Sequence, residues 1–466
     1  MAEALATAQS GTDLDLKSLA AEVVARAVKA GATDAEAVVS EGDEFSVSVR
    51  MGEVETLQES GSRGMGLRVF VGQRSASAST SDLTPDGITQ LVSGAMALAQ
   101  VTEADTFAGL PDNADFGQLD TDLHLYYDDV YSLPGAERID LARRAEAAAL
   151  AADARITNSQ GGHFDAATGR RVLANSRGFL GEYRTSYCGI SSAPLAIGPD
   201  GAMQRDFWSS SARRMADLES PESIGQEAAR RALRRLGARR VPTQRVPIVF
   251  APEVARSLIG HLFEAASGDS IWRSASFLAG ELGKLVAAPN ITIIDDHTMI
   301  LPNCVGGFGT SPFDGDGLRT RRTVVVENGI LQTYLLNTYT ARKLQMRSTG
   351  NATRGLAGSP GIGGGNLFLL PGEQTPEQIL ADIPAGFYVT SLMGFGANLV
   401  TGDYSRGASG LWIENGELTH AVEEVTIAGN LREMLRNITA IGNDLEFRSS
   451  TACPTLRVDG MTVAGA

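Results

Sequence analysis

Residues that bind metals or act as nucleophiles are scarce in this sequence. Its 466 residues include five histidines and three cysteines. No two histidines stand four residues apart, the helical spacing that points two imidazoles at one zinc ion. The cysteines are scattered and give no disulfide framework. An enzymatic site must therefore be assembled from distant segments or supplied by another chain.

Positive charge and long apolar runs are also in short supply. Forty Lys and Arg residues against 55 Asp and Glu give a formal net charge of -15, which argues against a nucleic-acid partner. No run approaches the about 18 apolar residues that indicate a membrane span, and residues 1–16 lack the basic region and apolar core of a secretory signal. We therefore expect no nucleic-acid or membrane partner and a cytoplasmic, reducing location.

The length and the periodicity indicate several α+β domains. The chain is too long for one ordinary core, and 52 glycines with 6% aromatic residues indicate many tight turns. Helical periodicity in residues 16–27 gives way to strand alternation in residues 45–51 and 67–71. We predict amino-terminal α/β-layer domains with an antiparallel sheet, then a mainly antiparallel β domain that forms a curved sheet or partial barrel. The predicted domains are residues 1–105, 106–245 and 246–466.

Short local motifs mark helix starts and hairpin turns. Thr84-Pro85 places a hydroxyl at an N-cap and a proline at the first helical position. Thr375 and Gln378 form a capping box that opens another helix. Three dipeptides between apolar runs predict two-residue hairpin turns: Asn328-Gly329, Asn415-Gly416 and Asp459-Gly460.

Two groups of polar residues contain metal-ligating types. His261 flanks the apolar stripe of the helix predicted after Pro252, and Glu264 lies one turn further on, so both could contact one ligand. Asp295-Asp296-His297 follows an apolar run, but adjacent strand residues point in different directions. We expect His261 to be a half-buried structural histidine and Asp295-Asp296-His297 to form a polar turn.

Four segments carry a family resemblance that covers nearly the whole chain. They are SRGMGLRVF at residues 62–70, the run at 311–354, GDYSRGASGLWIENGE at 402–417, and the ending that contains PTLRVDGMTVAG. These segments resemble the PmbA/TldE branch of the TldD/PmbA family. That family pairs two related subunits, and the TldD type resembles a zinc peptidase with an H-E-x-x-x-H helix and a carboxyl-terminal cysteine ligand.

The resemblance implies that this chain lacks the metal ligands of the TldD type. Alignment of the two helices places Ile259, Gly260 and Glu264 at the His, Glu and His positions, and leaves His261 out of register. The region that matches the carboxyl-terminal ligand, residues 441–444, contains no cysteine. We therefore expect no catalytic residue, metal or cofactor in this chain, and zinc in a TldD-like partner subunit.

By resemblance, this chain is the non-catalytic subunit of a TldD/TldE-type metallopeptidase that degrades or trims small unfolded peptides and precursor peptides. We expect a heterodimer or higher assembly with a TldD-like chain, in which an extended substrate adds as a strand to an exposed sheet edge. One alternative is an independent PmbA-type metallopeptidase, whose site at His261 is completed by His297 or Cys304. Another is a non-enzymatic, self-dimerising binding module. The candidate cavity-lining residues are His261, Glu264, Arg273, Tyr404 and Arg406.

Overall fold

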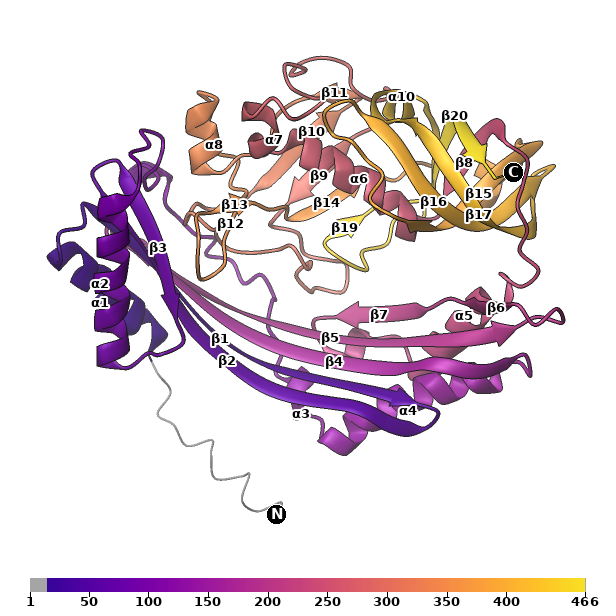
Figure 1. The fold of residues 1–466 in the computed structure, drawn as a ribbon, viewed down its shortest axis with the longest axis horizontal. Coiled ribbons are helices and arrows are strands. Elements are labelled where there is room, and N and C mark those ends of the chain that lie inside the picture. The colour runs from indigo at the N-terminus through magenta and orange to yellow at the C-terminus, as the bar shows by residue number, and fades with distance from the viewer. Residues whose placement is uncertain (1–14, 466) are drawn as a thin grey trace.

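Long antiparallel strands build the amino-terminal half of the structure, a computed structural model that describes residues 15–465. Most of the segment inspected for a secretory signal therefore lies outside the described residues. Seven strands form one curved sheet in the order β3-β2-β1-β4-β5-β6, with β7 also paired to β5 (Figure 1). Their bounds are β1 Asp34–Arg50, β2 Glu53–Val71, β3 Arg74–Thr80, β4 Ile156–Asn175, β5 Leu180–Ile197, β6 Met203–Arg205 and β7 Trp208–Ala212. This sheet draws on both of the first two predicted domains, whose boundaries stay predictions.

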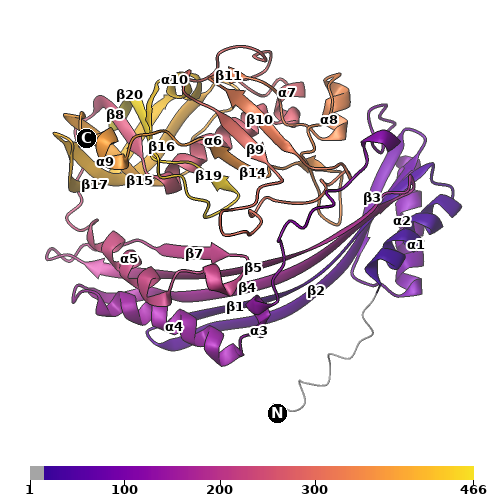
Figure 2. The ribbon, with the colours of Figure 1, turned by 180° about the vertical axis from the view of Figure 1, so that it is seen from behind.

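Helices cover the convex face of this sheet at its two ends (Figure 2). They are α1 Leu16–Lys29 and α2 Pro85–Val101 at one end, and α3 Asp129–Ser132, α4 Gly135–Ala151 and α5 Pro221–Leu233 at the other. The predicted start of α2 is confirmed, because the Thr84 hydroxyl accepts a hydrogen bond from the Gly87 amide at 3.2 Å. No helix of the described residues combines the length and apolar content needed to cross a bilayer.

The carboxyl-terminal half lies over the concave face of the sheet (Figure 1). Its main sheet has the order β17-β16-β15-β8-β20-β18, and a further pairing of β17 with β20 closes it into a small barrel. The sheet is mixed because β8 and β15 are parallel. The strands are β8 Gln244–Phe250, β15 Ala385–Met393, β16 Asp403–Glu414, β17 Glu417–Asn430, β18 Ile438–Ile441 and β20 Leu456–Ala464. The predicted α+β fold with a carboxyl-terminal curved sheet or partial barrel is confirmed.

A second sheet and five helices complete this half. The sheet order is β11-β10-β9-β14-β19, and β12 pairs with β13 separately. The strands are β9 Ile293–Asp296, β10 Arg322–Glu327, β11 Ile330–Leu331, β12 Ala352–Thr353, β13 Gly361–Ile362, β14 Asn366–Leu369 and β19 Thr451–Ala452. The helices are α6 Pro252–Ala266, α7 Gly268–Trp272, α8 Thr338–Lys343, α9 Pro376–Leu380 and α10 Leu431–Arg436. The predicted capping box of α9 is present in full.

Two of the three predicted hairpin turns are confirmed, and the third is wrong. Asn328-Gly329 joins β10 to β11 and Asn415-Gly416 joins β16 to β17, and all four residues have positive φ. Asp459-Gly460 instead lies inside β20, which continues along β8 on both sides of it. The register shifts between Val458 and Met461, so the positive φ of Gly460, 79°, serves a bulge rather than a turn.

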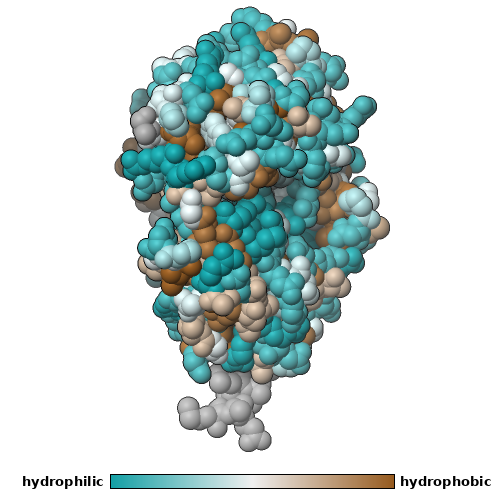
Figure 3. Space-filling view, turned by 90° about the vertical axis from the view of Figure 1, so that its right-hand side faces the viewer, coloured by the Kyte–Doolittle hydropathy of each residue, from teal (hydrophilic) through white to brown (hydrophobic). Residues whose placement is uncertain are grey.

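Buried polar contacts hold the two halves together. Arg213 follows β7 and donates to the carbonyls of Gly306 and Gly307, both at 2.8 Å. Glu36 of β1 lies 2.8 Å from the guanidinium of Arg354 in the carboxyl-terminal half. From the right-hand side of Figure 1, hydrophilic residues gather around the middle of the molecule, between the two halves (Figure 3). The halves therefore meet through polar groups as well as apolar packing.

Candidate functional site

Helix α6 occupies the place where the family resemblance puts a metal-binding helix. Pro252 is its first residue, and its apolar face, with Leu258, Ile259 and Leu262, packs into the largest hydrophobic core of the described residues. His261 lies on the flank of this face with 19% of its side chain exposed, and its Nδ1 is 3.8 Å from Oε2 of Glu264. The prediction of a half-buried histidine on the flank of this helix is confirmed.

Strand β16 brings two further predicted residues against α6. The rings of His261 and Tyr404 meet edge to face with centroids 6.1 Å apart. Burial lowers the pKa of His261, and the Arg406 guanidinium lowers it further while Glu264 opposes the change. Burial also raises the pKa of Tyr404 to about 12. At neutral pH both side chains are therefore uncharged beside a cationic arginine.

Four of the five predicted cavity residues thus come together, and the fifth lies elsewhere. Arg273 follows α7, and its guanidinium lies over the Trp272 ring at 4.6 Å from the centroid. Among the five, Arg406 lines a pocket of about 490 Å³. The functional roles of all five residues stay predictions.

This pocket, here called the α6 pocket, lies between the two halves of the molecule. Its lining includes Trp208, Arg256, Ser257, Arg406, Asp444 and Cys453. The sequence analysis missed Trp208 and Arg256. Arg256 lies on the predicted helix, five residues before His261, and this position was the only local sign that it could line the site. Nothing in the sequence indicates that β7 brings Trp208 to the same place.

Two more pockets continue the α6 pocket along the space between the halves. One, of about 420 Å³, is lined by Arg171, Arg213 and His297 among others. A smaller one of about 230 Å³ shares Arg213 with that pocket and Arg448 with the α6 pocket. The three pockets therefore form one row between the curved sheet and the carboxyl-terminal half.

The residues around α6 do not fit a zinc site. Ile259 is fully buried hydrocarbon, Gly260 has no side chain, and Glu264 is a single carboxylate that is 61% exposed. Cys453 lines the α6 pocket, but burial raises the pKa of its thiol far above the usual value, which disfavours the thiolate that binds metals. Within residues 15–465, no three His, Cys, Asp or Glu side chains are grouped as a metal site requires.

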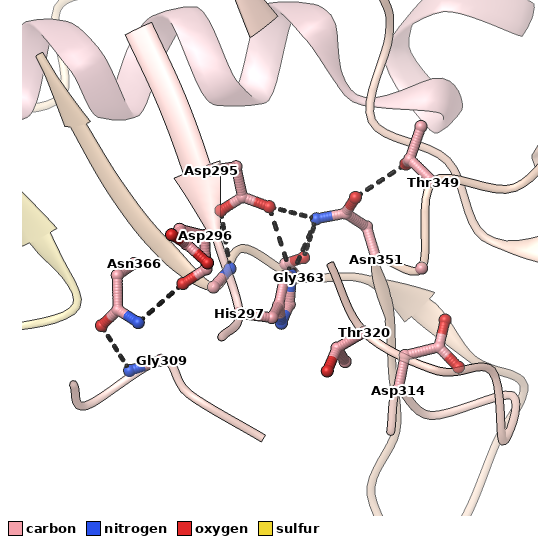
Figure 4. Close-up of polar contacts among 12 residues, drawn as sticks. Asp295, Asp296, His297, Gly309, Asp314, Thr320, Thr349, Asn351, Gly363 and Asn366 are labelled. Atoms are coloured by element: carbon pink, nitrogen blue, oxygen red, sulfur yellow. Dashed lines mark hydrogen bonds and ion pairs between the residues drawn. The ribbon is translucent and has the colours of Figure 1, made fainter. Parts of the chain in front are cut away.

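His297, a possible third metal ligand if the chain were an independent metallopeptidase, lies in a buried polar network (Figure 4). The Asn351 amide donates to Asp295 at 2.6 Å and lies 3.2 Å from Nε2 of His297. Asp295 also accepts from the Gly365 amide at 2.7 Å. Asp295 and Asp296 end β9 and the turn begins only at His297, so the predicted polar turn is wrong for the two aspartates. These hydrogen bonds hold the glycine-rich loop before β14 in place, so the network has a structural role.

Cys304, the other residue that could complete a metal site at His261, lies apart from this network. It is exposed on a loop with a positive φ of 60°, and its carbonyl accepts from the Tyr127 hydroxyl at 3.4 Å. His297 contacts Asp295 and Asn351, as described above. No contact between His261 and either Cys304 or His297 is found in the described part of the chain.

Asp314, which lines the pocket of Arg213, makes stability depend on pH. Burial raises its pKa from 3.8 to about 7, the Asp316 carboxylate adds to the rise, and backbone amides oppose it. A raised pKa means that the folded state binds the proton more tightly than the unfolded state, so this stabilisation is complete below about pH 4 and is lost as the pH rises through about 7.

We therefore expect Asp314→Asn to flatten the fall in the free energy of unfolding between pH 5 and pH 8, measured by urea denaturation. Asp153→Asn is the control, because Arg155 lowers the pKa of Asp153 to about 2 and the group does not titrate in this window. Equal pH slopes for the parent chain and Asp314→Asn would contradict the expectation.

Comparisons with known proteins match most of the chain. Models described as the PmbA/TldA metallopeptidase domain 1, central domain and C-terminal domain match residues 35–99, 128–236 and 243–465. The chain is 41% identical over 432 residues to Metalloprotease PmbA of Escherichia coli O157:H7, covering 92% of each protein. It is 38% identical over 454 residues to the Metalloprotease PmbA homolog of Haemophilus influenzae, covering 97% of this chain and 96% of that protein.

Solved structures share the fold over nearly the full length. A crystal structure of a candidate modulator of DNA gyrase from Bacteroides thetaiotaomicron superposes with a TM-score of 0.89 and 27% identity, covering 98% of this chain and 100% of that one. TldE from Thermococcus kodakarensis superposes with a TM-score of 0.83 and 20% identity, covering 95% and 99%. At 20% identity, the similarity to TldE is a similarity of fold alone.

Proposed function

The chain belongs to the PmbA/TldD metallopeptidase family, and from this premise we propose that it is the non-catalytic subunit of a two-chain metallopeptidase complex. Membership links it to proteolysis. In the proposed complex, a TldD-like partner holds the zinc and this chain helps to enclose and present unfolded peptides. We place the complex in the bacterial cytoplasm as part of the same proposal.

The chemistry of α6 is the observation that carries this proposal. Where the resemblance assigns ligands and a general base, the side chains are buried hydrocarbon at Ile259, none at Gly260 and one exposed carboxylate at Glu264. In metallopeptidases, bound zinc supplies a water of lowered pKa as the nucleophile. Residues 15–465 hold no comparable group of donors, which supports a supply of that chemistry by the partner.

Two short strand edges support a role in holding extended peptides. Strand β7 pairs with β5 on one side and β19 pairs with β14 on one side. Trp208 and Ser209 of β7 and Thr451 and Ala452 of β19 line the α6 pocket. The two strands belong to opposite halves of the molecule (Figure 1). A peptide that adds to such an edge gains backbone hydrogen bonds with little dependence on its sequence, which suits varied unfolded substrates.

Reconstitution tests the proposal directly. We expect this chain alone and the TldD-like chain alone to leave an unstructured fluorogenic peptide intact or nearly so, and their mixture to cleave it at least about 100-fold faster, with elemental analysis finding zinc on the partner. A stably folded protein is the control substrate, because confinement excludes it.

Two outcomes would replace the proposal. Stoichiometric zinc on this chain, lost in His261→Ala, together with cleavage by this chain alone, would establish an independent metallopeptidase. Purification from the native cell as a self-dimer without any TldD-like chain would favour the binding module.

A further inference from the structure

The acidic side chains of the α6 pocket are all engaged, while two of its arginines have no acidic partner. Four acids line the pocket, and each has a partner: Asp206 with Arg235, Glu253 with Arg231, Glu446 with Arg448, and Asp444 with Thr455. Arg256 donates to the Ser449 hydroxyl at 3.1 Å. Neither Arg256 nor Arg406 forms an ion pair with any carboxylate of the described residues. The four acids and four arginines of the lining balance in formal charge, and Arg256 and Arg406 are the two arginines left without an ion-pair partner among the described residues.

The surroundings of Arg406 leave buried polar atoms without hydrogen bonds. Nε of Arg406 and Nε2 of His261 are buried without a hydrogen-bond partner among the described residues, and the Tyr404 hydroxyl lies close enough to Arg406 for the guanidinium to oppose the rise of its pKa. Burying a polar group without a partner is costly, and burying a guanidinium without a counter-charge is more so. Arg406 is partly buried and lines the α6 pocket, so an anion bound there would supply the counter-charge that its guanidinium lacks.

The rest of the pocket suits an extended peptide rather than a small inorganic anion. The guanidinium groups of Arg231 and Arg448 lie over the Trp208 ring, at 3.8 Å and 4.2 Å from its centroid, and all three residues line the pocket. Val254 and Leu392 add aliphatic surface. A volume of about 490 Å³ lies within the usual range for pockets that bind organic ligands. The strand edges of β7 and β19 border the same space.

We propose that the α6 pocket binds a carboxylate group of an extended peptide, with Arg406 as the main contact and Arg256 as the second. The peptide is a substrate of the complex only if the proposed function holds, but its binding to this chain is a separate property. Arginine recognises a carboxylate through two parallel N–H···O bonds, which fix the direction of the bound group. The site would therefore set which part of a substrate enters the space between the halves first.

The bound carboxylate can be the peptide's own carboxyl terminus or an acidic side chain, and three peptides distinguish these sources. Each is an unstructured octapeptide with neutral side chains and an amino-terminal fluorescent dye that is uncharged and has no carboxylate. The first has a free carboxyl terminus, the second an amidated terminus, and the third an amidated terminus and one internal glutamate. Fluorescence anisotropy with this chain alone measures binding. Tighter binding of the first or third peptide than of the second, by about tenfold or more, supports the proposal and names the source. Equal binding of all three peptides, or no binding of any, overturns it.

Variants then assign the contact to its residues. Arg406→Gln should weaken binding of the preferred peptide by about tenfold, as expected for loss of one charge-assisted contact, while Arg406→Lys should retain part of it. Arg256→Gln should have a smaller effect in the same direction. Arg63→Gln is the matched control, since this arginine lies on β2, pairs with Glu41 and lines none of the three pockets.

The variant results decide the assignment even if the complex proves inactive. An unchanged affinity in Arg406→Gln that is folded by circular dichroism would contradict the role of this arginine. If Arg406→Gln does not fold, the comparison of amidated and free peptides on the parent chain still decides the proposal. Failure of the reconstituted cleavage assay, with carboxylate-dependent binding intact, would refute the proposed function and leave this inference standing.

Discussion

Ile259→His should lower the free energy of unfolding by roughly 3 kcal/mol or more. Ile259 is fully buried in the largest core, so the change removes an aliphatic side chain that packs there and buries an imidazole without a hydrogen-bond partner. Urea denaturation of the parent chain and the variant measures the difference. The expected loss would show that position 259 serves the core in this chain, although the family resemblance aligns it with a metal ligand.

The neighbouring positions on α6 provide matched controls. A Cβ added at Gly260 meets no atom within 4 Å, so Gly260→Ala should stabilise the helix by up to about 1 kcal/mol. Glu264→His should change stability by no more than about 0.5 kcal/mol, because Glu264 is exposed. An Ile259→His chain as stable as the parent, with tightly bound zinc, would instead show that this position faces a site able to hold metal.

Local chemistry was sufficient to predict many elements of the fold. The hydroxyl of Thr84 and the capping box at Thr375 mark helix starts because the capping contacts lie within a few residues. The turns at Asn328 and Asn415 follow from the ease with which Asn-Gly takes positive φ. Strand alternation and these turns also predicted the carboxyl-terminal curved sheet or partial barrel, which pairing of β17 with β20 closes.

The features that were not predicted from the sequence depend on pairing between residues far apart in the chain. Asp459-Gly460 has the composition of a turn, but continuous pairing with β8 on both sides keeps β20 in one strand and turns the glycine into a bulge. The prediction of the candidate site was incomplete for the same reason. Arg406 and His261 were selected from separate motifs, whereas Trp208 shares the pocket of Arg406 only because the curved sheet lies under the carboxyl-terminal half (Figure 1).

The contact between the two halves depends on the buried carboxylate of Glu36, and its removal is the second change for which we expect a large loss of stability. Glu36 of β1 is 1% exposed and lies 3.2 Å from Arg68 of β2 and 2.8 Å from Arg354 of the carboxyl-terminal half. Removing one member of a buried ion pair leaves the other charges buried without compensation, which costs about 3–5 kcal/mol. We therefore expect Glu36→Ala to lower the free energy of unfolding by that amount in urea denaturation.

A matched pair of variants separates this effect from loss of an ordinary surface ion pair. Glu41, on the same strand, pairs with Arg63 and Arg170 but is 22% exposed, so Glu41→Ala should cost no more than about 1 kcal/mol. If the cost of Glu36→Ala comes from uncompensated guanidinium groups, adding Arg354→Met should recover part of it, because one buried charge is then removed. Additive losses in the double variant would contradict this account and show that Glu36 and Arg354 stabilise the contact between the halves independently.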